Sequence, residues 1–217
     1  RWLFNASIMG CSGCFCAGLA NGAFWTLGPV FAQESGMSIN SVAIFMSVTV
    51  LGGALSQWPL GKISDTMDRR KVMGFCCFFA GSMGLGLALT HGHSMTTMWI
   101  LIFMFGVFTF PLYSLSVAHA NDSVSREDFV EVSSGLLLIF GVGAIIGPLL
   151  ASKLIQHFGQ PSLFVFTAIV HGLTGIFAYY RITQRERAPI EEREDFISIP
   201  RTSPELNLLD PRSEEQL

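Results

Sequence analysis

An all-α membrane protein with six transmembrane helices is the fold class that this sequence predicts, on three observations. Half of the 217 residues are apolar and only 13% are charged, against about 25% charge in an ordinary soluble domain. The last 37 residues hold nine of the sixteen acids and six of the thirteen bases. Elsewhere five runs contain no Asp, Glu, Lys or Arg: 2–33, 35–61, 72–121, 132–152 and 154–180. Each run exceeds the roughly 20 residues that cross a bilayer.

The first four spans follow from these runs. The first is expected over residues 2–31, where Gly28 and Pro29 should bend or end the helix near the outer surface. The second is expected over 39–60. The run 72–121 would form a helix of about 75 Å, more than twice the hydrocarbon thickness, so it must turn back once. The polar stretch 91–94 is the place for that turn, and the fourth span is expected over 96–118.

Spans five and six are expected over 132–154 and 161–180. The polar connector 119–131 precedes span five, and Ser125 and Asp128 have the spacing of a helix-start capping box. Gly147 and Pro148 form a step suited to a bend in a moving helix. The sequence therefore divides into a membrane domain over 1–180 and a tail over 181–217. The tail has four prolines and no apolar periodicity, and we expect it to be disordered and cytoplasmic.

The placement of the basic residues predicts the orientation in the membrane. With six spans, Lys153 is the only one of the thirteen bases that falls on one side, and the other twelve fall together on the opposite side. Basic loops remain in the cytoplasm. Both termini and the loop after span two are therefore expected to be cytoplasmic.

Two further patterns concern the whole architecture. The chain opens on Arg1 and Trp2 and its first span begins at once, so we expect it to be the carboxyl half of a longer protein or a fragment. Spans one to three also show a weak sequence repeat in spans four to six, as in transporters built from three-helix repeats. Small residues four apart, such as Gly18 with Gly22 and Gly143 with Gly147, are expected to allow close helix packing.

The five cysteines could be metal ligands or small packing residues. Cys14 is expected about 18 Å deep in its span and Cys76 about 6 Å deep, whereas ligands of one zinc ion lie within a few ångströms of each other. We therefore expect packing residues and no metal site. No cofactor is expected, and no basic surface suggests a nucleic acid partner.

The loop of residues 61–71 carries the most informative motif. Gly61 is followed four residues later by Asp65 and, after a second turn, by the basic pair Arg69 and Arg70. A tight cytoplasmic turn needs Gly61, and the Asp65 carboxylate can accept hydrogen bonds from a facing helix N-terminus. The bases hold the turn at the anionic leaflet. A basic loop without a gating role is the alternative.

This loop resembles the loop signature of the major facilitator superfamily, a family of membrane transporters. Thr66 stands where a base is usual in that family, and Asp68 where glycine is usual. Residues 24–29 and 52–59 add to the resemblance, which covers residues 1–180 and points to the carboxyl half of the YcaD-like bacterial members. It implies half of a twelve-helix bundle, with a missing amino-terminal six-helix half as partner.

The resemblance also implies a substrate cavity lined by spans one and four. The candidate cavity residues are Asn21, Trp25, Thr109, Tyr113 and Ser116, which lie at helical spacings on one face of each span. Polar groups in hydrocarbon must be satisfied or face water. Asn21 could equally form a hydrogen bond between helices, and Trp25 could be a packing aromatic. His171 on span six is expected to be a polar contact without a transport role.

The function that we predict is secondary active transport by alternating access, as an antiporter or symporter, across the bacterial inner membrane. The substrate is expected to be a small organic solute or drug-like compound. The sequence has no Walker motif for ATP and no acid within a span, so a coupling proton would be carried in the missing half, or the protein would be a uniporter. A membrane scaffold or regulatory subunit is the alternative. An enzyme is not expected, because the spans have no catalytic groups at depth.

Overall fold

The computed structural model describes residues 2–90 and 95–184, and in these ranges every element is a helix. Six helical stretches are long and apolar enough to cross a membrane, which confirms the predicted fold class. In chain order the elements are α1 (Trp2–Ala6), α2 (Ile8–Glu34), α3 (Ile39–Thr66), α4 (Arg69–Thr90), α5 (Met95–Thr109), α6 (Pro111–Asn121), the 3₁₀ turn η1 (Arg126–Asp128), α7 (Phe129–Phe158) and α8 (Ser162–Gln184). Residues 181–184, expected to begin the disordered tail, form the last turn of α8 instead. The turn expected at 91–94 and the disorder expected over 185–217 lie outside the described residues.

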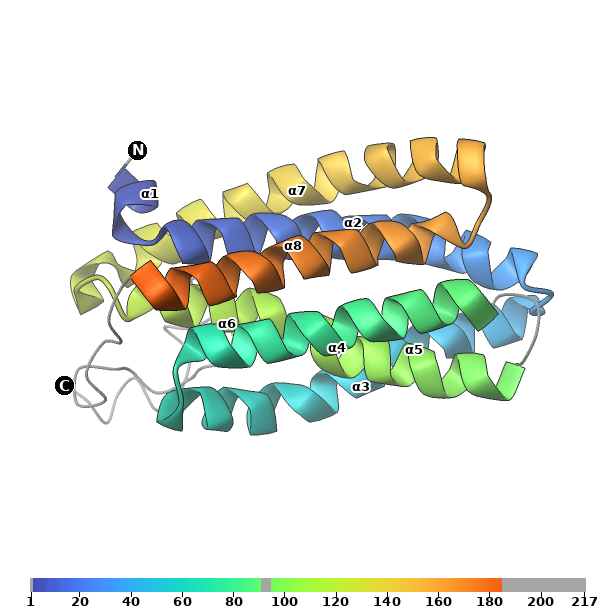
Figure 1. Cartoon of the computed structure of the whole chain (residues 1–217), viewed down its shortest axis with the longest axis horizontal. Coiled ribbons are helices and arrows are strands. Elements are labelled where there is room, and N and C mark those ends of the chain that lie inside the picture. Colours follow the sequence, from blue (N-terminus) through green and yellow to red (C-terminus); the bar gives the residue numbers. More distant parts are fainter. Residues whose placement is uncertain (1, 91–94, 185–217) are drawn as a thin grey trace.

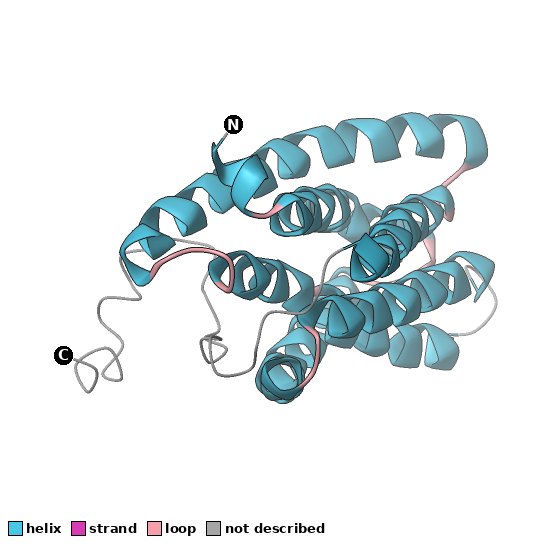
Figure 2. Cartoon of the chain, turned by 60° about the vertical axis from the view of Figure 1, so that its left-hand side comes forward, coloured by secondary structure: helices cyan, strands magenta, loops and turns pink. Residues whose placement is uncertain are grey.

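The spans lie side by side along one direction, and α1 and the end of α8 are at the same end of the bundle (Figure 1; Figure 2). We call this end, which carries Lys62, Arg69, Arg70, Lys71 and Arg181, the basic end. The most extensive contacts join α2 to α7, α4 to α8 and α3 to α5. This pairing is unchanged when spans one to three are exchanged with spans four to six, as expected of a three-helix repeat.

Glycines allow the paired helices to approach closely. A Cβ atom added at Gly18 or Gly22 of α2 would overlap the α7 backbone, and one added at Gly143 or Gly147 of α7 would overlap the α2 backbone. The equivalent pair α3 and α5 has the same arrangement, with Gly106 against the carbonyl of Thr49. Since lipid provides no hydrophobic drive between helices, this close backbone contact supplies much of the attraction.

The fourth span is broken, which the sequence analysis did not anticipate. α5 ends at Thr109, Phe110 forms a turn, and α6 begins with Pro111. Because proline has no N–H, it leaves the carbonyl four residues earlier without its helical donor. That carbonyl belongs to Val107, and it accepts a hydrogen bond of 2.7 Å from the Ser56 hydroxyl of α3. The break is therefore stabilised from the neighbouring helix rather than by lipid.

The start of the first span also differs from the expectation. The helix is interrupted at Ser7, whose extended backbone (φ −151°) and hydroxyl cap α2, accepting from the N–H of Gly10 at 3.1 Å. At the other end, Gly28 and Pro29 do not end α2, which continues to Glu34. α7 likewise continues through Gly147 and Pro148. Whether either step bends during transport stays a prediction.

The predicted role of Gly61 as a turn residue is wrong. α3 continues to Thr66 and Gly61 is buried within it, so the connection to α4 consists of Met67 and Asp68 alone. The first charged residue marks the end of an uncharged run, but a helix can project charged turns beyond the hydrocarbon. Lys62 does so by extending over the ring of Trp58, with its Nζ 5.3 Å from the ring centroid, so that its charge reaches the interface.

At the connector the predicted capping box is wrong. The Ser125 hydroxyl donates to the Asp128 carboxylate at 2.8 Å, but the N-cap of α7 is Asp128, and its side chain accepts no bond from the first turn of the helix. Residues 126–128 form a 3₁₀ turn directly before α7, and α7 begins at Phe129, three residues before the expected start of the span. Span five therefore begins with an extra turn at the basic end.

Candidate functional site

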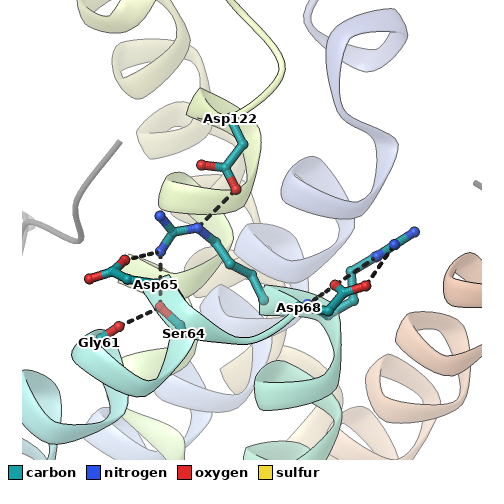
Figure 3. A network of polar contacts seen from close by, with 7 residues as sticks. Gly61, Ser64, Asp65, Asp68 and Asp122 are labelled. Carbon is teal, nitrogen blue, oxygen red and sulfur yellow. Dashed lines mark hydrogen bonds and ion pairs between the residues drawn. The ribbon is translucent and has the colours of Figure 1, made fainter. Parts of the chain in front are cut away.

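Three helix ends meet at the basic end around one arginine. Arg69 opens α4, and its side chain is only 1% exposed. Its Nη1 lies 3.0 Å from a carboxylate oxygen of Asp65 at the end of α3, and its Nε lies 2.9 Å from a carboxylate oxygen of Asp122, directly after α6. Figure 3 shows the two carboxylates on either side of the guanidinium. The arginine therefore joins the first three-helix repeat to the second.

Ser64 completes the environment of this guanidinium. Its hydroxyl accepts from Nη1 of Arg69 at 2.9 Å and donates to the carbonyl of Gly61 at 2.6 Å (Figure 3). A buried charge is tolerated only where counter-charges and hydrogen bonds surround it. Asp122 is nearly as buried as the arginine, with 6% of its side chain exposed, whereas Asp65 keeps 24%. Of the two carboxylates, that of Asp65 is thus the one that a further element could reach.

A second ion pair holds the turn between α3 and α4. The Asp68 carboxylate accepts from the backbone N–H of Arg70 at 3.0 Å and from its guanidinium at 2.7 Å. Nη1 of Arg70 also donates to the carbonyl of Arg181 in α8 at 2.8 Å. Burial alone would raise the pKa of Asp68, but the hydrogen bonds and charge of Arg70, together with His119, hold that pKa below its usual value. Asp68 is therefore held as a carboxylate and fixes Arg70, which links the turn to α8.

The structure divides the predicted loop residues between two networks and adds partners that the sequence did not indicate. Asp65 and Arg69 pair directly, Gly61 contributes only its carbonyl to that network, and Arg70 pairs with Asp68 instead. Arg69 and Arg70 are both buried, so the prediction that these bases hold the turn at the anionic leaflet is wrong. Asp122 was missed because it lies 53 residues from Arg69. The one available signal was its position, at the end of the fifty-residue run without charge.

The predicted cavity residues lie in two different environments. Asn21, Thr109, Tyr113 and Ser116 are buried inside the six-helix bundle, whereas Trp25 is 43% exposed. The Ser116 hydroxyl donates to the carbonyl of Leu112 at 2.6 Å, and the Tyr113 ring packs edge-on against Phe140. Asn21 and Thr109 have no hydrogen-bond partner for any side-chain polar atom. The lining role of these five residues remains a proposal.

His171 of α8 is also buried, and its Nδ1 lies 2.7 Å from the carbonyl of Thr167 in the same helix. A carbonyl only accepts, so this nitrogen carries the hydrogen. The bond runs within one helix, and the ring edge lies against Phe105.

The expected difference in depth between Cys14 and Cys76 is wrong. Because α2 begins at Ile8 and α4 at Arg69, Cys14 and Cys76 lie about 9 Å and 10.5 Å from their helix starts. The cysteines are nevertheless free thiols, and the described residues contain no group of three His, Cys, Asp or Glu that could hold a metal ion.

Six apolar spans in two three-helix repeats, tied by a buried arginine at one end, define a multi-pass membrane protein of the transporter class. The family model described as Major Facilitator Superfamily matches residues 10–212. The chain belongs to the Major Facilitator Superfamily. This membership points to a transporter rather than an enzyme.

Curated relatives give the same assignment. The chain is 30% identical over 164 residues to the "Uncharacterized MFS-type transporter YcaD" of Escherichia fergusonii, and 31% identical over 164 residues to the protein of that name in Salmonella newport. Each match covers 75% of this chain and 41% of the relative. The chain thus spans about two fifths of the length of these relatives.

Proposed function

We propose that this chain is the carboxyl-terminal six-helix half of a secondary active transporter that works by alternating access. The substrate is a small organic solute or drug-like compound, and the membrane is the bacterial inner membrane. Family membership supports this proposal, as do the six spans and the match to less than half of each relative. Twelve bases on one side support cytoplasmic termini.

The observation that carries the mechanism is the ion network of Asp65, Arg69 and Asp122. It ties the end of α3 and the start of α4 to the end of α6, so it holds the two repeats together at the basic end. Opening that end requires α6 to move relative to the turn between α3 and α4. In the closed state the ion pairs are formed, and in the open state water replaces them. The network is therefore a lock with two discrete arrangements.

The Asp65 carboxylate can bond on two sides. One carboxylate oxygen pairs with Arg69, and the side chain stays partly exposed at the helix end. A helix N-terminus from the missing amino-terminal half is the partner suited to that exposed carboxylate, because its free N–H groups and dipole favour an anion. The lock would then extend across the interface between the two halves.

The coupling ion, where there is one, is bound elsewhere in the complete protein. The five uncharged runs leave no carboxylate inside a span of this chain, and proton-coupled transporters use intramembrane acids for this purpose. Proton or ion coupling is therefore assigned to the missing half.

Uptake by membrane vesicles tests the proposal. Vesicles containing the full-length protein, with a panel of labelled organic solutes, should show saturable uptake that empty vesicles lack. Replacing Asp122 with Asn should reduce this uptake, because the α6 end loses its tie. If no solute in the panel is taken up while the protein is folded and still recruits other proteins through its tail, the scaffold alternative is favoured.

A further inference from the structure

Asn21 and Thr109 are buried, and every polar atom of their side chains lacks a hydrogen-bond partner. Both polar atoms of the Asn21 amide and the hydroxyl of Thr109 are covered. An unsatisfied buried polar group destabilises the folded state. Ser56 and Ser116, by contrast, bond to backbone carbonyls nearby. His171 and Asp122 each have one buried atom without a partner but bond through the other. Asn21 and Thr109 bond through none of their side-chain atoms, and this needs an explanation.

Asn21 and Thr109 face each other across one helix interface. Three contacts set the register of α2 against α5 and α6: Gly10 on Ala120, Gly13 on Ser116, and Phe24 on Phe105. Because the helices are antiparallel, the residue numbers in each contacting pair add to nearly the same sum. The same register places Asn21 opposite Thr109. One amide and one hydroxyl thus converge at the point where α5 ends.

An aromatic surface adjoins this polar pair. Trp25 lies one helical turn beyond Asn21, and Phe110 directly follows Thr109. The two rings are stacked in parallel, with centroids 5.7 Å apart and an interplanar angle of 4°. Phe110 is held from behind by close contact with Gly53 of α3, whereas the Trp25 side chain is partly exposed. A flat apolar surface therefore lies beside unsatisfied donors and acceptors.

The walls of this region are uncharged. Residues 2–33 and 72–121, which include all of α5 and α6 and nearly all of α2, contain no Asp, Glu, Lys or Arg. An ionised group placed there would lose its hydration without gaining a counter-charge, and that cost is large. The amide and hydroxyl instead suit a neutral group with its own donor and acceptor.

We propose that Asn21, Thr109 and Trp25 form a binding site for an uncharged aromatic or heteroaromatic solute that carries an amide or hydroxyl group. The ring stacks at Trp25, and the polar group bonds to Asn21 and Thr109. The site is closed in this structure and opens when α2 separates from the break between α5 and α6. This inference rests on the proposed transport function and names the class of its substrate.

Equilibrium dialysis on the full-length protein in nanodiscs tests the site without transport. The probes are benzamide, benzoate, benzylamine and cyclohexanecarboxamide, with empty nanodiscs as background. Benzamide should bind best, because it alone combines a flat ring with a neutral amide. Asn21→Leu and Thr109→Val should each weaken benzamide binding about threefold to tenfold, the value of one hydrogen bond. Trp25→Leu should abolish the advantage of benzamide over cyclohexanecarboxamide.

Matched controls separate binding from folding. Thr174→Val removes a hydroxyl already bonded to the carbonyl of Val170 within α8, and Trp58→Leu removes an exposed indole on α3; neither should change benzamide binding. Asn21→Leu should keep or raise the thermal stability, because it removes unsatisfied groups at similar volume. The proposal is overturned if no probe binds, if a charged probe binds best, or if the Asn21 and Thr109 variants bind like wild type. Transport failure with this binding pattern intact would contradict only the transport function.

Discussion

Arg69 is the residue whose replacement should destabilise the bundle most. Arg69→Met leaves the carboxylates of Asp65 and Asp122 without the cation between them, and breaking a buried ion pair from one side costs about 3–5 kcal/mol. Asp122→Asn keeps one carboxylate for the guanidinium and should cost about 1 kcal/mol. Thermal unfolding in nanodiscs measures both variants, and the double variant should recover part of the loss. Equal, small effects of the two single variants would show that the network contributes little.

Asp68 gives the turn between α3 and α4 a defined pH dependence. Its pKa in the folded protein is below the usual value of about 3.9. Its contribution to stability is therefore fully present above the pKa of the unfolded chain and is lost as the pH falls through the folded pKa. Wild-type protein should lose thermal stability below about pH 4, and Asp68→Asn should lack this component. A wild-type profile unchanged by the substitution would contradict the assignment.

Contacts between residues far apart in the sequence could not be predicted from the loop motif. The loop motif singled out Asp65, Arg69 and Arg70, but the structure pairs Asp65 with Arg69 and Arg70 with Asp68. It could not predict that Asp122 shares Arg69, because that contact depends on how α6 packs against α4. It also gave no role to Asp68, which accepts three hydrogen bonds from Arg70.

At the scale of the elements, glycine positions decide how closely the helices pair. A side chain at Gly106 would overlap the backbone of Thr49 in α3, whereas a Cβ at Gly172 of α8 meets nothing within 4 Å. Gly106→Ala should therefore force α3 and α5 apart at a cost of about 1–3 kcal/mol. Gly172→Ala should be neutral or slightly stabilising, because alanine favours helix.

Thermal unfolding of the two glycine variants, measured side by side, checks this difference. Similar melting temperatures for both would contradict the close packing of α3 and α5. The same comparison on the other pair uses Gly147→Ala, since a Cβ there meets the carbonyl of Leu19.

The number of spans was predictable, because uncharged runs of this length have few alternatives in a bilayer. Their ends were less predictable, since a helix can extend charged turns beyond the hydrocarbon, as α3 does to Thr66. The break at Phe110 had a visible cause in Pro111, but hydropathy alone does not report it. What stabilises the break is the Ser56 hydroxyl, 51 residues away, and only the packing reveals it.

For the whole molecule, the orientation in the membrane can be tested directly. Ser123 is exposed at the basic end, and Gln156 is exposed at the opposite end of α7. A membrane-impermeant maleimide added outside intact cells should label Gln156→Cys and not Ser123→Cys. The five native cysteines set the background in the parent protein. Labelling of Ser123→Cys alone would reverse the proposed topology.

We propose that the ion network at the basic end sets the access state while the solute binds further along the bundle. Asp65 lies at the end of α3, about 18 Å from a site at mid-membrane. One measurement separates the two roles most directly: turnover and equilibrium solute affinity of full-length Asp65→Asn in vesicles, with Asn21→Leu alongside. Asp65→Asn should lower turnover several-fold and leave affinity nearly unchanged, and Asn21→Leu should weaken affinity first. Loss of affinity in Asp65→Asn, with Asn21→Leu unaffected, would contradict the account.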